Sequence, residues 1–279
     1  MKDTIIGCID GSSSATAVCQ YGAWVASKLN VPLTLLHVLE KADVSTSKDL
    51  SGSIGFDSRE VLLAELVQIE GERARLMKEQ GKQLLRVAGE MARSLGVNEV
   101  NAVQKHGALA EILGEIPDAK MMVLGRKGEQ SETREHVGSQ LESVIRLQKC
   151  PILVSTGDFV PPRRIMFAYD GSAEGKKVLE RLAINPLLQG IDCHLVMNGD
   201  DLTALEAAQI TLKNVGINSQ VHLISGSHIA ESLCRYALEN DIHLMIMGAY
   251  GHSRLRQFFI GSNTTAMLAK TPIPLLMMR

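Results

Sequence analysis

The chain carries one sequence pattern twice, and this duplication constrains its fold more than any other feature. Residues 4–17 (TIIGCIDGSSSATA) match residues 164–177 (RIMFAYDGSAEGKK), and in both an apolar run ends in Asp-Gly-Ser before a helical pattern. Further matching segments follow in the same order in the two halves. Self-similarity over so long a period predicts two copies of one structural module.

The length of the chain and a proline-containing linker support this division. The chain has 279 residues, which fits two domains at roughly 150 residues each. The halves are separated by the segment TGDFVPPRR, whose adjacent Pro161 and Pro162 resist both a helix and a central strand. We therefore expect a first domain at residues 1–156, a linker at 157–163 and a second domain at 164–279.

Each half alternates short runs rich in Ile, Val, Leu and Met with longer amphipathic segments. This alternation is typical of a parallel sheet covered by helices on both faces. The fold class is therefore expected to be α/β, with two tandem doubly wound five-stranded parallel sheets of strand order 3-2-1-4-5 and helices on both faces. The strands of the first half are expected at residues 3–9, 32–38, 99–104, 120–125 and 151–155. Those of the second half are expected at residues 164–169, 192–197, 219–224, 243–248 and 273–278.

The last strand of each half, CPILVS in the first and IPLLMM in the second, is an apolar edge. An unpaired edge would expose backbone hydrogen-bonding groups, so we expect the two to pair and form an intramolecular pseudo-dimer. The halves differ mainly at residues 40–97, where the first has a polar Ser/Gly-rich loop and a long helical stretch. That segment is a candidate surface for another ligand or a partner.

A glycine pattern also recurs, in GRKGEQSETREHVGS at 125–139 and GAYGHSRLRQFFIGS at 248–262. Each follows an apolar strand-like run and precedes a helical pattern, so backbone N–H groups and the positive end of a helix dipole converge where a phosphate can be held. Two alternatives stay open, because the serines could simply cap helices and one duplicated loop could have lost its ligand. The candidate phosphate-binding residues are Gly125, Gly128, Gly138, Ser139, Gly248, Gly251, Gly261 and Ser262.

An aspartate follows the first strand of each half, Asp10 in one and Asp170 in the other. In a sheet of order 3-2-1-4-5 a crevice opens at the carboxyl ends of strands 1 and 4, where we expect Asp10 to meet Gly125 and Asp170 to meet Gly248. A carboxylate suits ribose hydroxyls or an adenine amino group, and the glycine loop suits phosphate. Together they predict a nucleoside polyphosphate site, although each aspartate could instead cap the next helix.

These motifs resemble those of the universal stress protein family in its tandem, two-domain form. The family's ATP signature, G-x2-G-x9-G-[S/T], is met in full by both glycine loops, and the resemblance covers essentially the whole chain. It implies an adenine-nucleotide-binding α/β fold, ATP as the ligand, alone or with Mg²⁺, and a role in stress survival rather than in a metabolic reaction. It also implies pairing through the last strands, within the chain and, as a further option, in a homodimer.

The resemblance further implies which residues surround the nucleoside. Asp10 and Asp170 would contact it, and the backbone at Val38 and Met197 would hold adenine. The remaining residues that we place in the second site by this resemblance are Tyr169, Ala249 and Asn263.

The two glycine loops differ in charge. The first has Glu129, Glu132 and Glu135 between its glycines, only partly offset by Arg126 and Lys127, whereas the second has His252, Arg254 and Arg256. Because carboxylates near a triphosphate are unfavourable, we expect the second half to be the better nucleotide site.

Composition and missing motifs narrow the function. The formal net charge of −2 argues against binding to nucleic acid. The sequence lacks a signal peptide and any apolar run of about 18 residues, so we expect a cytoplasmic location and no membrane association. The five cysteines form no CxxC pair and are expected to be reduced, mostly buried thiols, and the histidines have no metal-ligand spacing.

Three classes of function therefore remain. The first is an ATP-binding stress-response protein with at most weak ATP hydrolysis. The second is an ATP-cleaving or adenylating enzyme, for which the sequence has neither a P-loop nor an adenylation signature. The third is a nucleotide-independent scaffold for protein interaction, in which both glycine loops are only tight turns.

Overall fold

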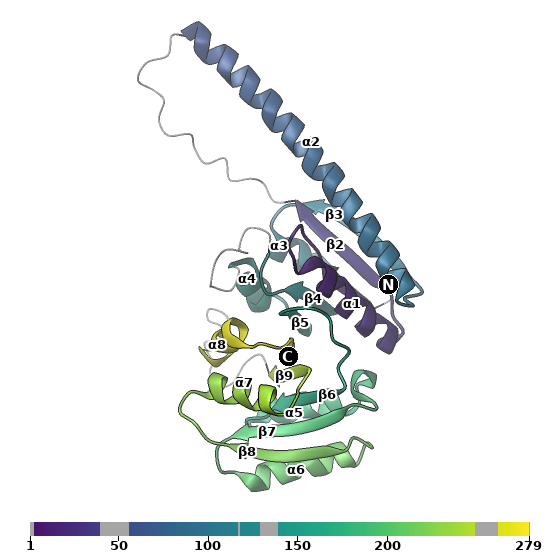
Figure 1. Ribbon diagram of the computed structural model, residues 1–279, viewed down its shortest axis with the longest axis vertical. Helices are drawn as coiled ribbons and strands as arrows, with labels where there is room; N and C mark the ends of the chain where they lie inside the picture. Colours follow the sequence, from purple (N-terminus) through teal and green to yellow (C-terminus); the bar gives the residue numbers. More distant parts are fainter. Residues whose placement is uncertain (1–2, 40–55, 117, 129–138, 249–261, 279) are drawn as a thin grey trace.

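A computed structural model describes the chain except for residues 1–2, 40–55, 117, 129–138, 249–261 and 279. The first half contains β1 (Thr4–Cys8), β2 (Leu33–Leu39), β3 (Val100–His106), β4 (Ala119–Gly125) and β5 (Ile152–Ser155). The second half contains β6 (Arg164–Ala168), β7 (Asp192–Asn198), β8 (Ser219–Ile224), β9 (Leu244–Gly248) and β10 (Leu275–Met278). These described strands form one ten-stranded sheet in the order β3-β2-β1-β4-β5-β10-β9-β6-β7-β8 (Figure 1).

The sheet confirms the predicted fold class. Each half has the strand order 3-2-1-4-5 with parallel neighbours, and every expected strand is present with its limits within two residues of the expected ones. The central strands are apolar because both faces are covered: Ile5 and Ile6 are adjacent, point to opposite faces and are both fully buried. The outer strands β3 and β8 have polar and partly exposed side chains.

Two layers of helices cover the sheet. One apolar core includes side chains from α1 (Ala15–Leu29), α2 (Phe56–Ser94), α5 (Ala173–Ala183) and α6 (Leu202–Lys213), together with the short helix η2 (Pro186–Leu188). The other includes α3 (Leu109–Gly114), α4 (Ser139–Leu147), α7 (Ile229–Glu239) and α8 (Ser262–Lys270). Because each core contains residues from both halves, the molecule is one continuous three-layer body.

The two halves join through their last strands, as predicted. β10 pairs antiparallel with β5, with Leu276 opposite Leu153 at the centre of the register. Side-chain contacts flank this pairing: Arg126 donates from Nη1 to the carbonyl of Thr271 at 2.6 Å, and Thr156 Oγ1 donates to the carbonyl of Pro272 at 3.3 Å. The strands would otherwise present two apolar edges, and their pairing satisfies both.

The linker is attached to the first half rather than free. The ring of Phe159 packs edge-on against Tyr21 of α1, with ring centroids 4.7 Å apart. The backbone N–H of Val160 donates to the hydroxyl of Tyr21 at 3.3 Å. The path of the linker across the junction is therefore fixed by packing as well as by its prolines.

The long helix predicted between strands 2 and 3 of the first half is α2. Its second part packs on β2 and β3, while its first part extends away from the sheet (Figure 1). In the second half the corresponding connection is the 12-residue helix α6, which packs along its length beside β7 and β8. The two modules thus differ most at α2.

A cluster of aromatic and histidine side chains lies between α7 and the outer strands of the second half. His194 of β7 and His222 of β8 are stacked with ring centroids 5.1 Å apart, and His194 Nδ1 lies 2.7 Å from the hydroxyl of Tyr236. Burial lowers the pKa of both histidines from the ordinary value of 6.5. The nearby His222 and Arg164 lower the pKa of His194 further, and the opposing effect of Asp192 is smaller. The folded protein therefore favours the neutral form of both rings.

This cluster predicts a pH dependence of stability. Because the pKa of each histidine is lower when folded than when unfolded, the unfolded chain binds more protons below the ordinary pKa of 6.5. We expect the free energy of unfolding to include the whole contribution of the neutral histidines above pH 6.5 and to decrease as the pH falls below that value. Urea unfolding should show a shallower decline between about pH 7.5 and pH 5.5 in His222→Gln than in the unaltered chain. The matched control is His106→Gln, at an exposed histidine, and equal declines in all three proteins would contradict the assignment.

The β5–β10 pairing predicts that the halves stay together without a covalent link. A protease site inserted between Gly157 and Pro162 would allow the linker to be cut in the folded protein. We expect both fragments to elute together on gel filtration at micromolar concentration, because separation would expose two apolar strand edges. Elution as two independent monomers would show that the pairing is too weak to hold the halves.

Candidate functional site

The predicted crevices lie at the carboxyl ends of β1 and β4 in the first half and of β6 and β9 in the second. The register pairs Gly7 with Val123 and Ala168 with Met247, so the residues that follow these strands leave the sheet side by side. This is the switch point of each doubly wound sheet, where ligands of such folds bind. The Asp-Gly-Ser turns and the beginnings of both glycine loops are located here.

The two aspartates adopt the same local structure. Asp10 Oδ1 accepts hydrogen bonds from the backbone N–H and the hydroxyl of Ser12, and Asp170 Oδ1 accepts the same pair from Ser172 at 3.0 and 2.7 Å. Helix α5 is capped by Ser172, whose hydroxyl accepts from the N–H of Gly175 at 2.9 Å. The alternative that Asp170 caps this helix is therefore wrong, and its carboxylate instead orients the turn.

In the first half the turn lies against the glycine loop, but not by the expected contact. A side-chain carbon at Gly128 would lie 3.0 Å from Asp10 Oδ2, and one at Gly125 would lie 2.6 Å from Cβ of Ser14. Asp10 therefore meets Gly128 rather than Gly125, because the chain turns back toward the aspartate after β4. Ser14 Oγ also donates to the carbonyl of Lys127 at 3.3 Å. The described start of the first loop, residues 125–128, therefore packs against the start of α1.

In the second half fewer of the described residues lie close to the corresponding glycine. Among the described residues, the nearest atom to a side-chain carbon built at Gly248 is Cγ2 of Val178, at 3.9 Å. Asp170 is exposed, whereas Asp10 is half-buried. Among the described residues, no atom of Asp170 lies within 4 Å of a side-chain carbon at Gly248, so the expected contact of Asp170 with Gly248 is not a close one.

Tyr169 lies directly before Asp170 and is almost fully buried. Burial raises the pKa of its phenol, and the carboxylates of Asp170 and Asp201 add to the shift. Asp201 also caps α6 by accepting from the N–H of Ala204 at 3.0 Å. Sequence reasoning did not single out Asp201, although the pair Asp200-Asp201 directly after the second strand is a visible signal. The second crevice therefore has more negative charge at its β7 side than the glycine loops alone indicate.

The expected adenine-binding positions, Val38 and Met197, lie near the carboxyl ends of β2 and β7. Each of these strands extends there beyond the end of the strand paired with it on the inner side, β1 or β6. The described ladder between β1 and β2 ends at Leu36, and that between β6 and β7 ends with a bond from Tyr169 N–H to the Val196 carbonyl. Val38 and Met197 follow, paired on their outer side with β3 and β8. Met197 Cε would lie 3.6 Å from a side-chain carbon at Gly171, whose φ of +71° favours glycine. The backbone at these positions is thus next to the Asp-Gly-Ser turns.

Several predicted site residues are outside the described part of the chain, namely Gly138, Ala249, Gly251 and Gly261. The charged residues used to compare the loops, from Glu129 to Glu135 and from His252 to Arg256, are outside it as well. Ser139 is the first residue of α4, and Ser262 and Asn263 are the first two of α8. Both glycine loops therefore lead into a helix N-terminus, as the sequence predicted.

The described ranges contain neither a cluster of metal-ligating side chains nor a disulfide. No group of three His, Cys, Asp or Glu side chains there is arranged to hold a metal ion. All five cysteines are free, and Cys19, Cys193 and Cys234 are buried, as expected for reduced thiols. No helix in this part of the chain combines the length and the apolar character that a membrane span requires.

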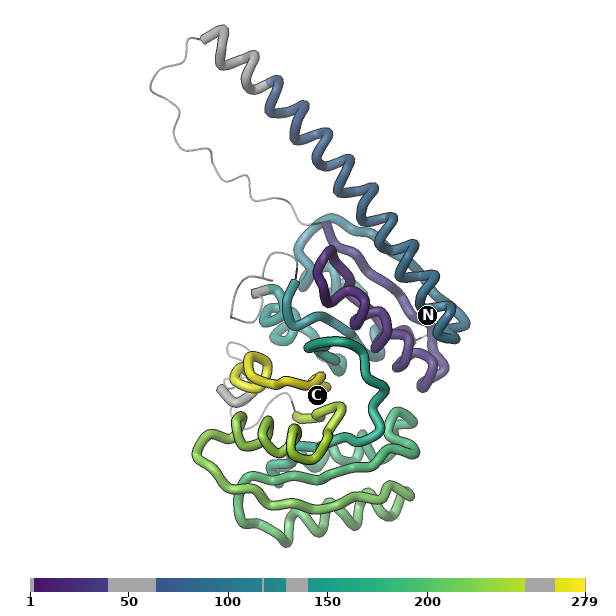
Figure 2. Tube along the Cα trace, in the orientation of Figure 1, coloured from purple at the N-terminus to yellow at the C-terminus, as the bar shows by residue number. Residues whose placement is uncertain are grey.

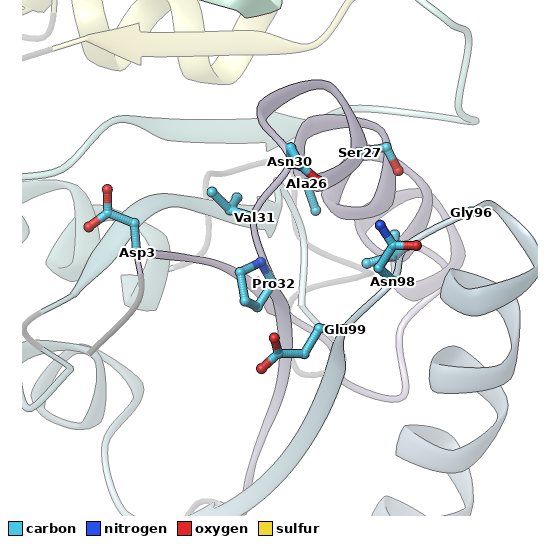
Figure 3. Close-up of a pocket in the computed structure, with 10 residues that line it drawn as sticks. Asp3, Ala26, Ser27, Asn30, Val31, Pro32, Gly96, Asn98 and Glu99 are labelled. Atoms are coloured by element: carbon cyan, nitrogen blue, oxygen red, sulfur yellow. The ribbon is translucent and has the colours of Figure 1, made fainter.

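A hollow of about 450 Å³ lies at the opposite end of the first half from the crevice. Figure 3 shows its lining, which includes Asp3 before β1, Pro32 before β2 and Glu99 before β3. These positions are at the amino ends of the strands, and none of the predicted site residues lines the hollow. It is a feature separate from the candidate nucleotide sites.

Comparison with known proteins agrees with the duplicated architecture. The model of the universal stress protein family matches residues 1–155 and again residues 162–279. Universal stress protein Slr1230 of Synechocystis is 36% identical over 289 aligned residues that cover 100% of both chains. A universal stress protein crystal structure from Archaeoglobus fulgidus has a TM-score of 0.72 and 18% identity over 99% of this chain and 96% of its own.

A smaller universal stress protein from Archaeoglobus fulgidus, solved in complex with dAMP, matches 43% of this chain and 100% of its own, with a TM-score of 0.34 and 17% identity. That complex describes what the smaller protein holds. The two family matches, the full-length relative and the tandem structure all coincide with the two sheets described above. The chain belongs to the universal stress protein family.

Proposed function

We propose that the chain is an ATP-binding stress-response protein that holds the nucleotide in the crevice between β6 and β9. The observation that carries this proposal is the position of Gly248, which ends β9 near the Asp-Gly-Ser turn after β6 and begins a loop that leads to the N-terminus of α8. No described atom lies closer than 3.9 Å to a side-chain carbon at this glycine. Strand end, glycine turn and helix start are the elements that together present N–H groups to a phosphate.

The contrast between the two crevices supports the choice of the second half. At Gly125 and Gly128 the surrounding atoms leave room for a hydrogen only, and the carboxylate of Asp10 faces the loop. A phosphate approaching there would meet that carboxylate, in addition to the three glutamates of the first loop. At Gly248 no described carboxylate lies within 4 Å of a side-chain carbon, and the sequence of the second loop supplies Arg254 and Arg256.

The acidic groups of the second crevice suit the nucleoside end of the ligand. Asp170 is exposed beside the Asp-Gly-Ser turn, and Asp201 lies at the start of α6, after β7. Carboxylates accept hydrogen bonds from ribose hydroxyls, and the backbone near Met197, on the inner side beyond the end of β6, can address the edge of adenine. In this orientation the triphosphate lies toward the glycine loop.

Mg²⁺ fits this arrangement only as a companion of ATP. It prefers oxygen ligands, keeps several waters and commonly binds through substrate phosphates plus one or two carboxylates. Asp170 is the described carboxylate best placed to contribute. The metal would supply charge neutralisation for the phosphates.

Paired glycine substitutions test which half binds ATP. In Gly251→Val a β-branched side chain would occupy the phosphate approach, so we expect most ATP binding to be lost, whereas Gly128→Val should remove little. Calorimetric titration with ATP gives both affinities. Gly157→Val is the matched control, because no described atom lies within 4 Å of a side-chain carbon at that position.

Folding must be followed in the same variants, since a strained turn alone can cost about 1–3 kcal/mol of stability. If Gly251→Val stays folded and binds ATP normally while Gly128→Val does not, the first half is the site. If both bind ATP like the unaltered chain, the glycine loops are turns only and the scaffold function is favoured.

The proposal also predicts a preference for adenine. The backbone beside Met197 can accept a hydrogen bond from the 6-amino group of adenine, whereas the 6-oxo group of guanine presents the wrong polarity. A poorly satisfied polar group costs about 1–3 kcal/mol, so ATP should bind roughly tenfold to a hundredfold more tightly than GTP. Equal dissociation constants for the two nucleotides would rule out this mode of recognition.

A further inference from the structure

The first part of α2 is a helix without a partner in the described part of the chain. Every residue from 64 to 80 is exposed, and Figures 1 and 2 show this stretch extending away from the sheet. Packing on the sheet begins at Gly81, where an added side-chain carbon would collide with Gln104 and His37. Seventeen residues at 1.5 Å each make an exposed arm of about 25 Å.

This arm carries an apolar stripe along one side. Leu66, Ile69, Leu76 and Met77 are 52%, 61%, 63% and 36% exposed. At 100° per residue, these four positions fall within an arc of about 100° on one face of the helix, with Arg73 between them. The later part of α2 packs on the sheet with a different face, which contains Gly81 and the buried residues after it. At 100° per residue, the two faces are roughly a quarter turn apart around the helix. We call these four apolar residues the α2 stripe.

Such a stripe is unfavourable in water. An isolated helix gains little stability by itself, and helices in proteins are stabilised mostly by packing an apolar face. Large apolar side chains that lie together on an otherwise charged surface mark interaction sites rather than solvated faces. The stripe therefore requires a covering surface of similar length.

The charges along the arm indicate what that surface is. Residues 64–72 contain three glutamates and no basic residue, whereas residues 73–82 contain four basic residues and one glutamate. At 100° per residue, Arg73 lies on the stripe with Glu70 and Glu72 at its two flanks, whereas the other basic residues lie on the opposite side of the helix. An identical helix running antiparallel would place Arg73 of each arm near Glu70 and Glu72 of the other. A parallel arrangement would place like charges together and align the two helix dipoles. The charged residues concerned are Glu65, Glu70, Glu72, Arg73, Arg75, Lys78, Glu79 and Lys82.

We propose that α2 is a dimerisation arm, and that two copies of the chain associate through antiparallel pairing of their α2 stripes. With the two-fold axis near residue 71, Leu66 would pack against the partner's Leu76. Arg73, the one charge within the stripe, would lie beside the partner's Ile69 and within reach of the partner's Glu70 and the partner's Glu72. The interface is self-complementary, as a two-fold dimer requires. It is independent of nucleotide binding.

Two matched substitutions test the surface. Ile69 and Val67 are both β-branched, both highly exposed, at 61% and 69%, and only two residues apart, but Val67 lies off the stripe. We expect the full-length chain to sediment as a dimer at micromolar concentration, Ile69→Glu to sediment as a monomer, and Val67→Glu to remain dimeric. Unfolding of each variant, followed by circular dichroism, checks that the fold is retained.

Cross-linking tests the direction of the pairing. In the antiparallel dimer the two copies of residue 73, which lies on the stripe, are about 6 Å apart along the helices, whereas the two copies of residue 66 are about 15 Å apart. Air oxidation should therefore cross-link Arg73→Cys and not Leu66→Cys, with the unaltered chain as the control for its five native thiols. Cross-linking of Leu66→Cys would indicate parallel helices and overturn the proposed direction.

The remaining outcomes are equally decisive. A monomeric unaltered chain would overturn the proposal and leave the stripe to a different protein. A dimer that survives Ile69→Glu would place the interface elsewhere, and loss of the dimer in both Ile69→Glu and Val67→Glu would show that the stripe is not the specific contact.

Discussion

The antiparallel pairing of β5 with β10 is the contact on which the arrangement of the two halves depends. Each half alone would be a five-stranded sheet ending in an apolar edge, and an exposed edge of this kind invites uncontrolled pairing. By pairing with each other, the strands close both edges and merge the two sheets into one. The helical layers then become continuous across the junction, so that each apolar core contains side chains from both halves.

This shared frame holds two crevices that are alike in backbone but not in environment. Both have an Asp-Gly-Ser turn with the same hydrogen bonds to a serine. In the first, Ser14 and Asp10 lie against the described start of the glycine loop, while in the second Val178 is the nearest described side chain to Gly248 and Asp201 adds negative charge near Tyr169. Duplication thus preserved the fold of the module while side chains set the two sites apart, which agrees with function being decided by the site rather than by the fold.

The long helix α2 shows how a module can change without affecting the sheet. Its second part does what a crossover helix in this fold must do, which is to cover β2 and β3. Its first part extends beyond the sheet and carries the α2 stripe, so it can act on a partner without altering either crevice. The connection after strand 2 tolerates such an extension because it lies at the outer end of the half, away from the β5–β10 junction.

The sequence by itself determined the duplication, all ten strands and both glycine loops, because strand and helix patterns depend on the spacing of apolar residues along the chain. It also indicated the β5–β10 pairing through the apolar character of both segments. Only the tertiary structure decided that Asp10 faces Gly128 rather than Gly125, and that Ser172, not Asp170, caps its helix. These contacts depend on how loops fold back in space, over distances of a few ångströms that sequence spacing does not encode. The exposure of the α2 stripe is of the same kind, since an amphipathic pattern predicts a buried face but not whether the chain itself provides the cover.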